Sequence, residues 1–281
     1  MGRARPIGPD QGDLFAGGGF DMAGGVTTAP TVPLTVDLRR LGDVDLLSAL
    51  PLTGSRDCAA YTDEAVRRRL PAAVPALSAL CRRFKGFGLS HPVREQTVAL
   101  AALTTIGGPE AANAVVRLLE DDVVAKPGLP FALDAAARLK ARLPIGIVRE
   151  NLDAAEPDIR ARACRCAIFW PSTVPRLIEL LDDLHREVSR EAAIALGMMG
   201  RPEARASLIR LVKDEPSPET IDALVAIGDD ECFVALGRLA DVWPDLRHLV
   251  VQALAGSEHR LAVTIVQRLE AGLIKTATTQ D

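Results

Sequence analysis

The residue types that carry out most enzyme chemistry are scattered along this sequence rather than grouped. Cys164 and Cys166 lie two residues apart in a predicted helix, so their side chains point in different directions and form no metal-binding pair. The other cysteines and the histidines occur singly: Cys58, Cys81, Cys232, His91, His185, His248 and His259. No Gly-x-Ser-x-Gly nucleophile motif and no glycine-rich phosphate loop after a strand is present. We therefore predict no catalytic residue, no metal site and no cofactor, and we expect that the protein is not an enzyme.

The composition favours a soluble protein of the cytoplasm. The chain has 281 residues, of which 48% are hydrophobic and only 4% aromatic, and its formal net charge is -4. A net negative charge gives no general attraction to nucleic acid, so we do not expect nucleic acid as the main direct ligand. The five cysteines are odd in number and lack a disulfide framework spacing, which is typical of a reducing compartment. No apolar run approaches the roughly 18 residues that cross a bilayer, and no secretory leader is evident, so we expect no membrane association.

The stretch 186–216 predicts a hairpin of two amphipathic helices. Val188, Ala192 and Leu196 recur four residues apart and therefore share one face of the first helix. The segment from Gly197 to Pro202 holds two glycines and a proline, and we expect it to end this helix. A second apolar-faced helix comes next, so the stretch forms an αα-hairpin that cannot bury its apolar face alone.

The same unit recurs along the chain. Further copies begin at His91, Leu129, Pro157, Ser217 and Pro244. The last large aliphatic residues of the second helices are 27 to 33 residues apart: Leu119, Leu152, Leu181, Val212, Leu239 and Leu269. A period near 30 residues is typical of stacked helical repeats. The sequence therefore predicts an all-α fold, an α-solenoid of about six αα-hairpin repeats.

The segment VSREAAIALGMMG, residues 188–200, resembles the HEAT-like repeat of the phycobilisome-lyase type. In that pattern a Val-Arg start precedes an Ala-Ala pair, a Leu-Gly step and a second small turn. The openings Val93-Arg94 and Ile159-Arg160 are similar, whereas residues 129–154 and 217–241 lack this opening. The resemblance covers roughly residues 91–271. It implies a HEAT-like solenoid, and such repeats occur in lyase-like proteins, adaptors, DNA-binding proteins and components of conflict systems.

Each predicted second helix carries at least one arginine. These residues are Arg117, Arg149, Arg176, Arg210, Arg238 and Arg268. Second helices usually line the concave face of HEAT arrays, so we expect a ladder of arginines there that could bind an acidic peptide or phosphates. The alternative is that the arginine stems only cover apolar surface. Trp170 and Trp243 each precede a proline at a helix boundary, and we expect both to pack between repeats.

The N-terminal region differs from the repeats and divides the chain into three predicted parts. Residues 1–30 are rich in Gly and Pro and predict a flexible tail, residues 31–90 predict an irregular or helical cap, and residues 91–281 predict the solenoid. The tail holds QGDLF, which resembles the short peptide by which bacterial proteins bind the DNA sliding clamp. Gln11, Asp13, Leu14 and Phe15 fit that pattern, whereas the glycine between Gln11 and Asp13 departs from the preferred leucine. The two apolar residues could also pack on the repeats.

These observations favour a non-enzymatic scaffold or adaptor of bacterial type that binds an unidentified protein partner through the concave face. The alternative is an accessory factor of DNA replication, repair or genome defence that is tethered to the sliding clamp by QGDLF. A third hypothesis is a lyase-like or DNA-glycosylase-like HEAT enzyme, for which a site of converging Cys, His or acidic residues would be needed.

Overall fold

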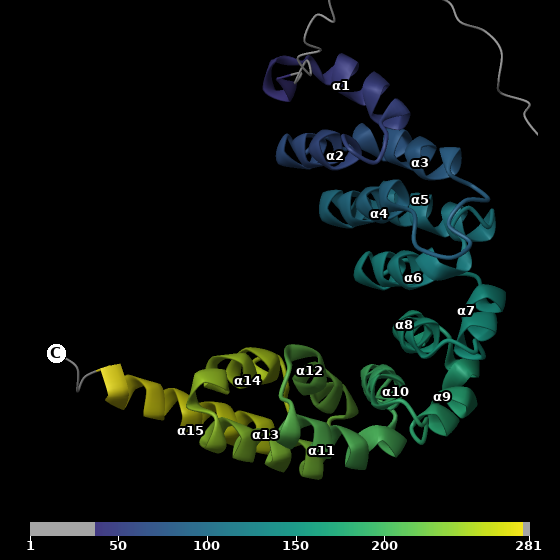
Figure 1. The fold of residues 1–281 in the computed structure, drawn as a ribbon. Helices are drawn as coiled ribbons and strands as arrows, with labels where there is room; N and C mark the ends of the chain where they lie inside the picture. Colours follow the sequence, from purple (N-terminus) through teal and green to yellow (C-terminus); the bar gives the residue numbers. More distant parts are fainter. Residues whose placement is uncertain (1–36, 278–281) are drawn as a thin grey trace, which may run out of the picture. The chain divides into compact units, whose positions relative to one another are not determined.

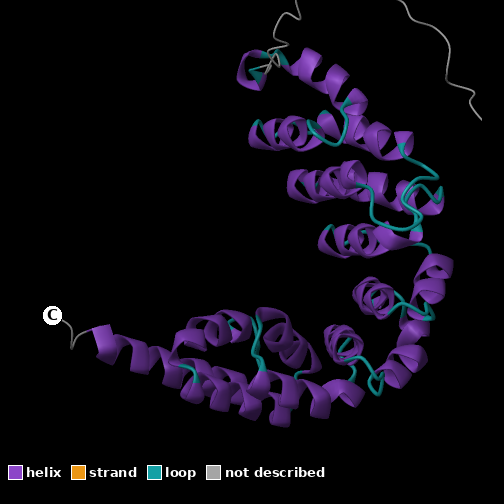
Figure 2. Ribbon diagram, viewed as in Figure 1, coloured by secondary structure: helices purple, strands orange, loops and turns teal. Residues whose placement is uncertain are grey.

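The computed structural model describes residues 37–277, and the side chains of residues 37–271. The chain divides into two units, residues 1–37 and 38–281, and every described helix belongs to the second unit. The described part of this unit consists of α-helices, short 3-10 helices and loops, with no strand among residues 37–277 (Figure 2). The predicted all-α solenoid is thus confirmed.

The α-helices are α1 (Asp43–Ala49), α2 (Cys58–Arg67), α3 (Ala73–Arg83), α4 (Arg94–Ile106), α5 (Gly108–Glu120), α6 (Leu129–Arg138), α7 (Ile145–Leu152), α8 (Pro157–Ala167), α9 (Val174–Leu180), α10 (Arg186–Met198), α11 (Arg205–Asp214), α12 (Pro218–Ile227), α13 (Asp230–Val242), α14 (Arg247–Leu254) and α15 (Arg260–Ala277). The 3-10 helices are η1 (Leu38–Arg40), η2 (Leu50–Leu52), η3 (Lys126–Gly128), η4 (Pro171–Thr173), η5 (Pro202–Ala204) and η6 (Pro244–Leu246).

From α4 onward the helices pair into six consecutive hairpins, α4–α5 to α14–α15 (Figure 1). The segment expected to form a cap contains a further hairpin, α2–α3, which packs on α4 and α5 in the same manner. The even-numbered helices α2 to α14 are the first helices of these hairpins, and the odd-numbered helices α3 to α15 are the second helices. Each first helix packs on the first helix of the next hairpin, so the first helices form one continuous layer.

The two layers are not equally close-packed, and this corrects one expectation from the sequence. First helices contact one another at every step, whereas neighbouring second helices from α5 to α11 make at most marginal contact. In a curved array the more closely spaced layer must lie on the inner side. Figure 1 shows the first helices on that inner side of the described repeats and the second helices outside. The second helices therefore do not line the concave face.

Small residues allow the closest approach between first helices, which occurs around α10. This helix packs on α8 and α12, and its buried positions include Ala192, Ala193 and Ala195. Gly197 was expected to help end the helix, but it lies inside α10 and is itself buried. A Cβ atom at this position would lie 2.6 Å from Leu208 Cδ1 and 2.7 Å from Ala223 Cβ. Gly197 therefore sets the spacing of α10 from α11 and α12, and the turn itself begins at Met199.

Proline residues organise the start of several second helices. η4 and η5, which precede the second helices α9 and α11, each begin with a proline, where its fixed φ angle suits a first helical turn and its missing N–H costs no hydrogen bond. Gly200 adopts a φ of 68° just before η5, a left-handed conformation that favours glycine. The hairpin turns thus follow directly from the prolines and glycines in the sequence.

A buried carboxylate on α2 helps to hold η1 and α1 against that helix. Glu64 on α2 is only 7% exposed, and it accepts hydrogen bonds from Arg67 Nε at 2.8 Å and Arg68 Nε at 2.7 Å. Arg68 also donates to the carbonyl oxygen of Leu38 at 2.7 Å and pairs with Asp43 Oδ1 at 2.7 Å. Hydrogen bonds from Arg67 and then Arg68 lower the pKa of Glu64 to about 2. This carboxylate therefore orients the arginine that ties η1 and α1 to α2.

Replacing Gly197 by alanine should destabilise the array. The added methyl group clashes with Leu208 and Ala223, and overpacking of this kind typically costs about 1–3 kcal/mol, which exceeds the gain in helix propensity of up to about 1 kcal/mol. Gly146→Ala is the matched control, because no atom lies within 4 Å of the added Cβ. Urea denaturation should show a lower midpoint for Gly197→Ala and an unchanged or higher midpoint for Gly146→Ala. Equal midpoints for the two variants would contradict this helix spacing.

Lowering the pH should reduce the free energy of unfolding, partly through protonation of Glu64. Because the folded-state pKa of about 2 lies below the ordinary value of 4.5, the ionised carboxylate stabilises the fold above pH 4.5, and this contribution is lost as the pH falls toward 2. The difference in unfolding free energy between wild type and Glu64→Gln should be constant above about pH 5.5, where the carboxylate is ionised in both states, and should shrink as the pH falls toward 2. Chemical denaturation followed by circular dichroism at several pH values measures this difference. A difference that does not change with pH would show that folding does not lower the pKa of Glu64.

Candidate functional site

The six arginines predicted as a ladder lie on the outer layer. Arg117, Arg149, Arg176, Arg210, Arg238 and Arg268 belong to α5, α7, α9, α11, α13 and α15, respectively. They are on the second helices as expected, but these helices form the outer side of the repeats. The predicted concave ladder is therefore wrong in its placement, because the expectation transferred a general property of HEAT arrays to this chain.

Three of these arginines are already engaged. Arg176 pairs with Asp153 at 2.8 Å and Glu179 at 2.7 Å, and Arg268 pairs with Asp241 at 3.1 Å. Arg210 donates to Ser207 Oγ at 3.3 Å. Arg117, Arg149 and Arg238 are exposed and have no ion-pair partner among residues 37–271. The arginines therefore do not act as one continuous positive strip.

The charged side chains of the first-helix layer neutralise one another. Glu191 on α10 is 1% exposed and binds Arg165 of α8 through two hydrogen bonds of 2.7 and 2.9 Å. Arg190 donates a third hydrogen bond to Glu191 at 3.0 Å, and Arg165 also reaches Asp134 of α6 at 3.3 Å. The hydrogen bonds to Glu191 raise the pKa of Arg165 above its ordinary value. This network links α6, α8 and α10, so we interpret it as structural.

The turn after α9 holds a second ion-pair cluster of the same kind. Asp183 accepts hydrogen bonds from Arg160 Nε at 3.0 Å and from the backbone N–H of His185 at 2.9 Å. Burial raises the pKa of Asp183, but the His185 N–H and the Arg160 guanidinium outweigh it, so that the pKa lies below its ordinary value. Arg160 also donates to the carbonyl oxygens of Ala154 and Ala155 at 2.8 Å. This cluster fixes the turns of neighbouring repeats.

An open apolar groove lies between α11 and α13 in the outer layer. Its volume is about 680 Å³, and its apolar lining consists of Ile209, Val212, Val234, Ala235, Leu239, Val242 and Trp243. The buried residues Ala235 and Leu239 form its floor. Val234 is 41% exposed, Val242 69% and Trp243 46%, which is unusual for a large apolar group on a soluble surface.

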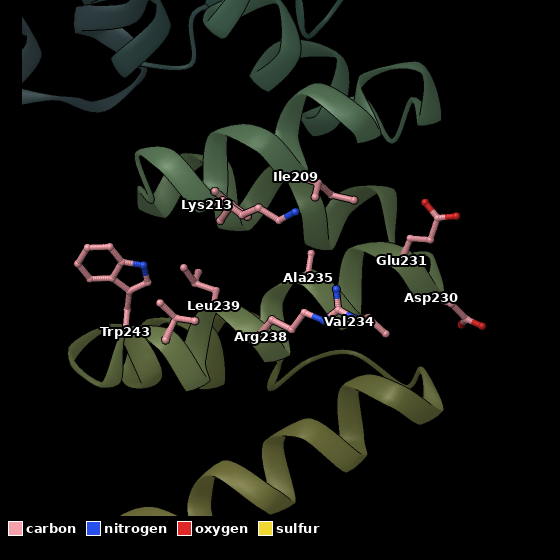
Figure 3. Close-up of a pocket in the computed structure, with 11 residues that line it drawn as sticks. Ile209, Lys213, Asp230, Glu231, Val234, Ala235, Arg238, Leu239 and Trp243 are labelled. Carbon is pink, nitrogen blue, oxygen red and sulfur yellow. The ribbon is translucent and has the colours of Figure 1, made fainter.

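Charged residues occupy defined places along this groove (Figure 3). Lys213 and Arg238 lie between the two helices, Trp243 lies at one end, and Asp230 and Glu231 lie at the other. Asp230 has a histidine partner, with 3.3 Å to His259 Nε2, and Glu231 lies 3.5 Å from an arginine nitrogen of α11. Lys213 and Arg238 have no ion pair or hydrogen bond to any described residue. The cations thus lie between the two helices without a described partner, whereas the carboxylates lie at the groove end.

The described residues offer little for catalysis. They contain no group of three or more His, Cys, Asp or Glu side chains that could hold a metal ion. All five cysteines are free and buried. Burial raises the pKa of Cys81 and of Cys166 to about 12, so neither thiol forms a nucleophilic thiolate near neutral pH.

The remaining predicted site residues, Gln11, Asp13, Leu14 and Phe15, lie outside the described residues, as do the boundaries of the predicted tail. No described helix is both long enough and apolar enough to span a membrane.

Comparison with known proteins agrees with the repeat architecture. The family model for HEAT repeats matches residues 147–228, which correspond to α7 to α12. Residues 147–228 are thus similar to HEAT repeats, and the finer phycobilisome-lyase subtype rests on the sequence resemblance alone. A similar solved structure is the crystal structure of an engineered protein from the Northeast Structural Genomics Consortium, with 17% identity and a TM-score of 0.32. That match covers 83% of this chain and 98% of the other. No curated protein is significantly similar to the sequence.

Sequence reasoning missed the groove because it assigned Trp243 to packing between repeats. Trp170 does pack in that way, since its Nε1–H donates to the carbonyl oxygen of Leu143 at 2.9 Å and Arg142 stacks on its ring. Trp243 instead lies at the groove end and is half exposed. The sequence did hold a signal for the groove. Leu236 and Ala240 mark the buried stripe of α13, and the apolar residues Val234 and Val242 lie outside that stripe.

Proposed function

We propose that this protein is a non-enzymatic interaction scaffold that binds a protein partner in the groove between α11 and α13. The observation that carries the proposal is the exposure of Val234, Val242 and Trp243 around a cavity of about 680 Å³. Tryptophan is among the residues that contribute most to protein interfaces, and a central apolar pocket is the usual anchor point. HEAT repeats generally serve as such scaffolds, which supports this reading.

The proposal places the partner on a different surface from the one expected from the sequence. On the first-helix side, Arg165, Arg190 and Glu191 satisfy one another, so a ligand there would have to break existing ion pairs. Breaking a buried pair by removing one partner typically costs about 3–5 kcal/mol. The groove requires no such rearrangement because its apolar rim is already exposed.

The double variant Val242→Ser/Trp243→Ala should abolish partner binding. It removes two of the three exposed apolar side chains of the groove, and a loss of about 2 kcal/mol or more is typical when an aromatic anchor of an interface is truncated. The measurement is chemical cross-linking of the full chain in lysate of the source cell, followed by mass spectrometry of the captured partners. The double variant should fold, because both side chains are largely exposed.

Leu184→Ser/Phe131→Ala is the matched control for this experiment. It also removes one aliphatic and one aromatic side chain, and Leu184 is 97% exposed and Phe131 47% exposed, but neither lines the groove. Wild type and control should capture the same partners, which the groove variant should lose. Recovery of the same partners with the groove variant would overturn the proposal.

The sequence also supports a second candidate function, a tether to the DNA sliding clamp. Gln11, Asp13, Leu14 and Phe15 match the clamp-binding pattern, in which two apolar anchors enter a preformed pocket. This candidate belongs to an accessory factor of replication, repair or genome defence, and it is compatible with a scaffold role of the repeats.

The full chain should bind purified bacterial sliding clamp in a manner that depends on Leu14 and Phe15. Titration by surface plasmon resonance should show binding by the wild type and a loss of at least about tenfold for Leu14→Ala/Phe15→Ala, because both anchors are removed. Val234→Ser, a substitution within the groove, is the control and should bind the clamp like the wild type. If wild type and the double alanine variant bind equally, or neither binds, the clamp hypothesis is wrong.

A further inference from the structure

The groove between α11 and α13 has the shape of a site for a third helix. On α13, Val234, Arg238 and Val242 succeed one another at intervals of four residues, and Ala235 and Leu239 form a second row beside them. The helix is 13 residues long, which corresponds to about 20 Å at a rise of about 1.5 Å per residue. Rows of side chains at this spacing create the straight ridges and grooves into which another helix packs.

The charges of the groove specify what such a helix must carry. Lys213 from α11 and Arg238 from α13 both lie between the helices, and neither has a partner among the described residues. A purely apolar ligand would cover these cations without compensating them, which is costly. A ligand with carboxylates beside its apolar stripe would instead form charge-assisted contacts at both positions.

A second copy of this chain fits the groove less well than a different partner. A symmetric dimer contact presents the same surface patch from both subunits. A twofold axis through the middle of the groove would bring Lys213 and Arg238 of the two copies close together, and this like-charge arrangement is unfavourable. Asp230 and Glu231 lie at the groove end, away from this axis, where Glu231 faces Arg205.

We infer that the groove binds an amphipathic α-helix of a partner protein whose apolar stripe covers Trp243, Val242 and Val234 and whose flanking carboxylates pair with Lys213 and Arg238. This inference rests on the proposed function and adds the chemistry of the partner. Helices of this kind bind through side chains at positions i, i+3, i+4 and i+7, which span about two turns and fit within the length of the groove.

The test uses the full chain and two labelled peptides that are stapled into helices. Both carry leucine at i, i+3, i+4 and i+7, and they differ only in having glutamate or lysine beside the leucine stripe. Fluorescence anisotropy measures their affinities. The wild type should bind the glutamate peptide at least about tenfold more tightly than the lysine peptide, because only the former matches Lys213 and Arg238.

Charge reversal gives the decisive comparison. Lys213→Glu/Arg238→Glu should invert the preference, so that the lysine peptide binds at least about tenfold more tightly than the glutamate peptide. Arg117→Glu/Arg149→Glu is the matched control, since it changes the net charge equally on exposed arginines of the same layer that do not line the groove. This control should keep the wild-type preference.

Several outcomes would overturn the inference. They are no binding of either peptide by the wild type, equal binding of both, or the same change of preference in the control as in the groove variant. Binding of lauric acid without binding of the glutamate peptide would assign the groove to an acyl ligand instead. A dimer in light scattering that Trp243→Ala dissociates would assign it to a second copy.

If these tests fail while Val242→Ser/Trp243→Ala still loses its cross-linked partners, only the partner's chemistry is wrong and the scaffold function stands.

Discussion

The close approach of the first helices is the constraint on which the rest of this structure depends. Gly197 and the alanines of α10 let it pack tightly between α8 and α12, and a single added methyl group at Gly197 would meet atoms of both α11 and α12. The buried Glu191 then ties α10 to α8 through Arg165. Small residues and ion pairs thus hold α6, α8 and α10 together in this layer.

The outer layer is less closely packed as a consequence of this arrangement. Tight spacing on the inner side of a curved array requires wider spacing outside, and neighbouring second helices from α5 to α11 accordingly make at most marginal contact, whereas α11 and α13 pack on each other. At α11 and α13 the groove has apolar walls that the fold does not cover, with Trp243 at its end. Exposed apolar surface of this extent lowers the solubility of a protein unless a ligand covers it. The packing of the first helices thus organises the core, and side chains of α11 and α13 that the fold leaves uncovered form the candidate site.

The repeat architecture could be predicted from the sequence, whereas the site could not. The length of the repeat and the presence of amphipathic helices follow from local patterns, such as the recurring apolar faces and the prolines that begin η4 and η5. These patterns can be recognised in a single sequence. Curvature depends on the relative spacing of two layers, which is a property of long-range packing. For this reason the arginines were assigned to the wrong side. Gly197 illustrates the same limit, since its sequence context suggests a helix end and only its neighbours in space show a packing role.

The most direct test of binding through the outer layer is hydrogen–deuterium exchange of the full chain with and without its cross-linked partner or, before that partner is identified, the glutamate peptide. Binding in the outer groove predicts slower exchange in residues 205–214 and 230–243, which include α11 and α13, and unchanged exchange in α8 and α10. Protection confined to α8, α10 and α12 would instead show that the ligand occupies the first-helix side. That result would contradict the central claim that this array binds through its outer layer.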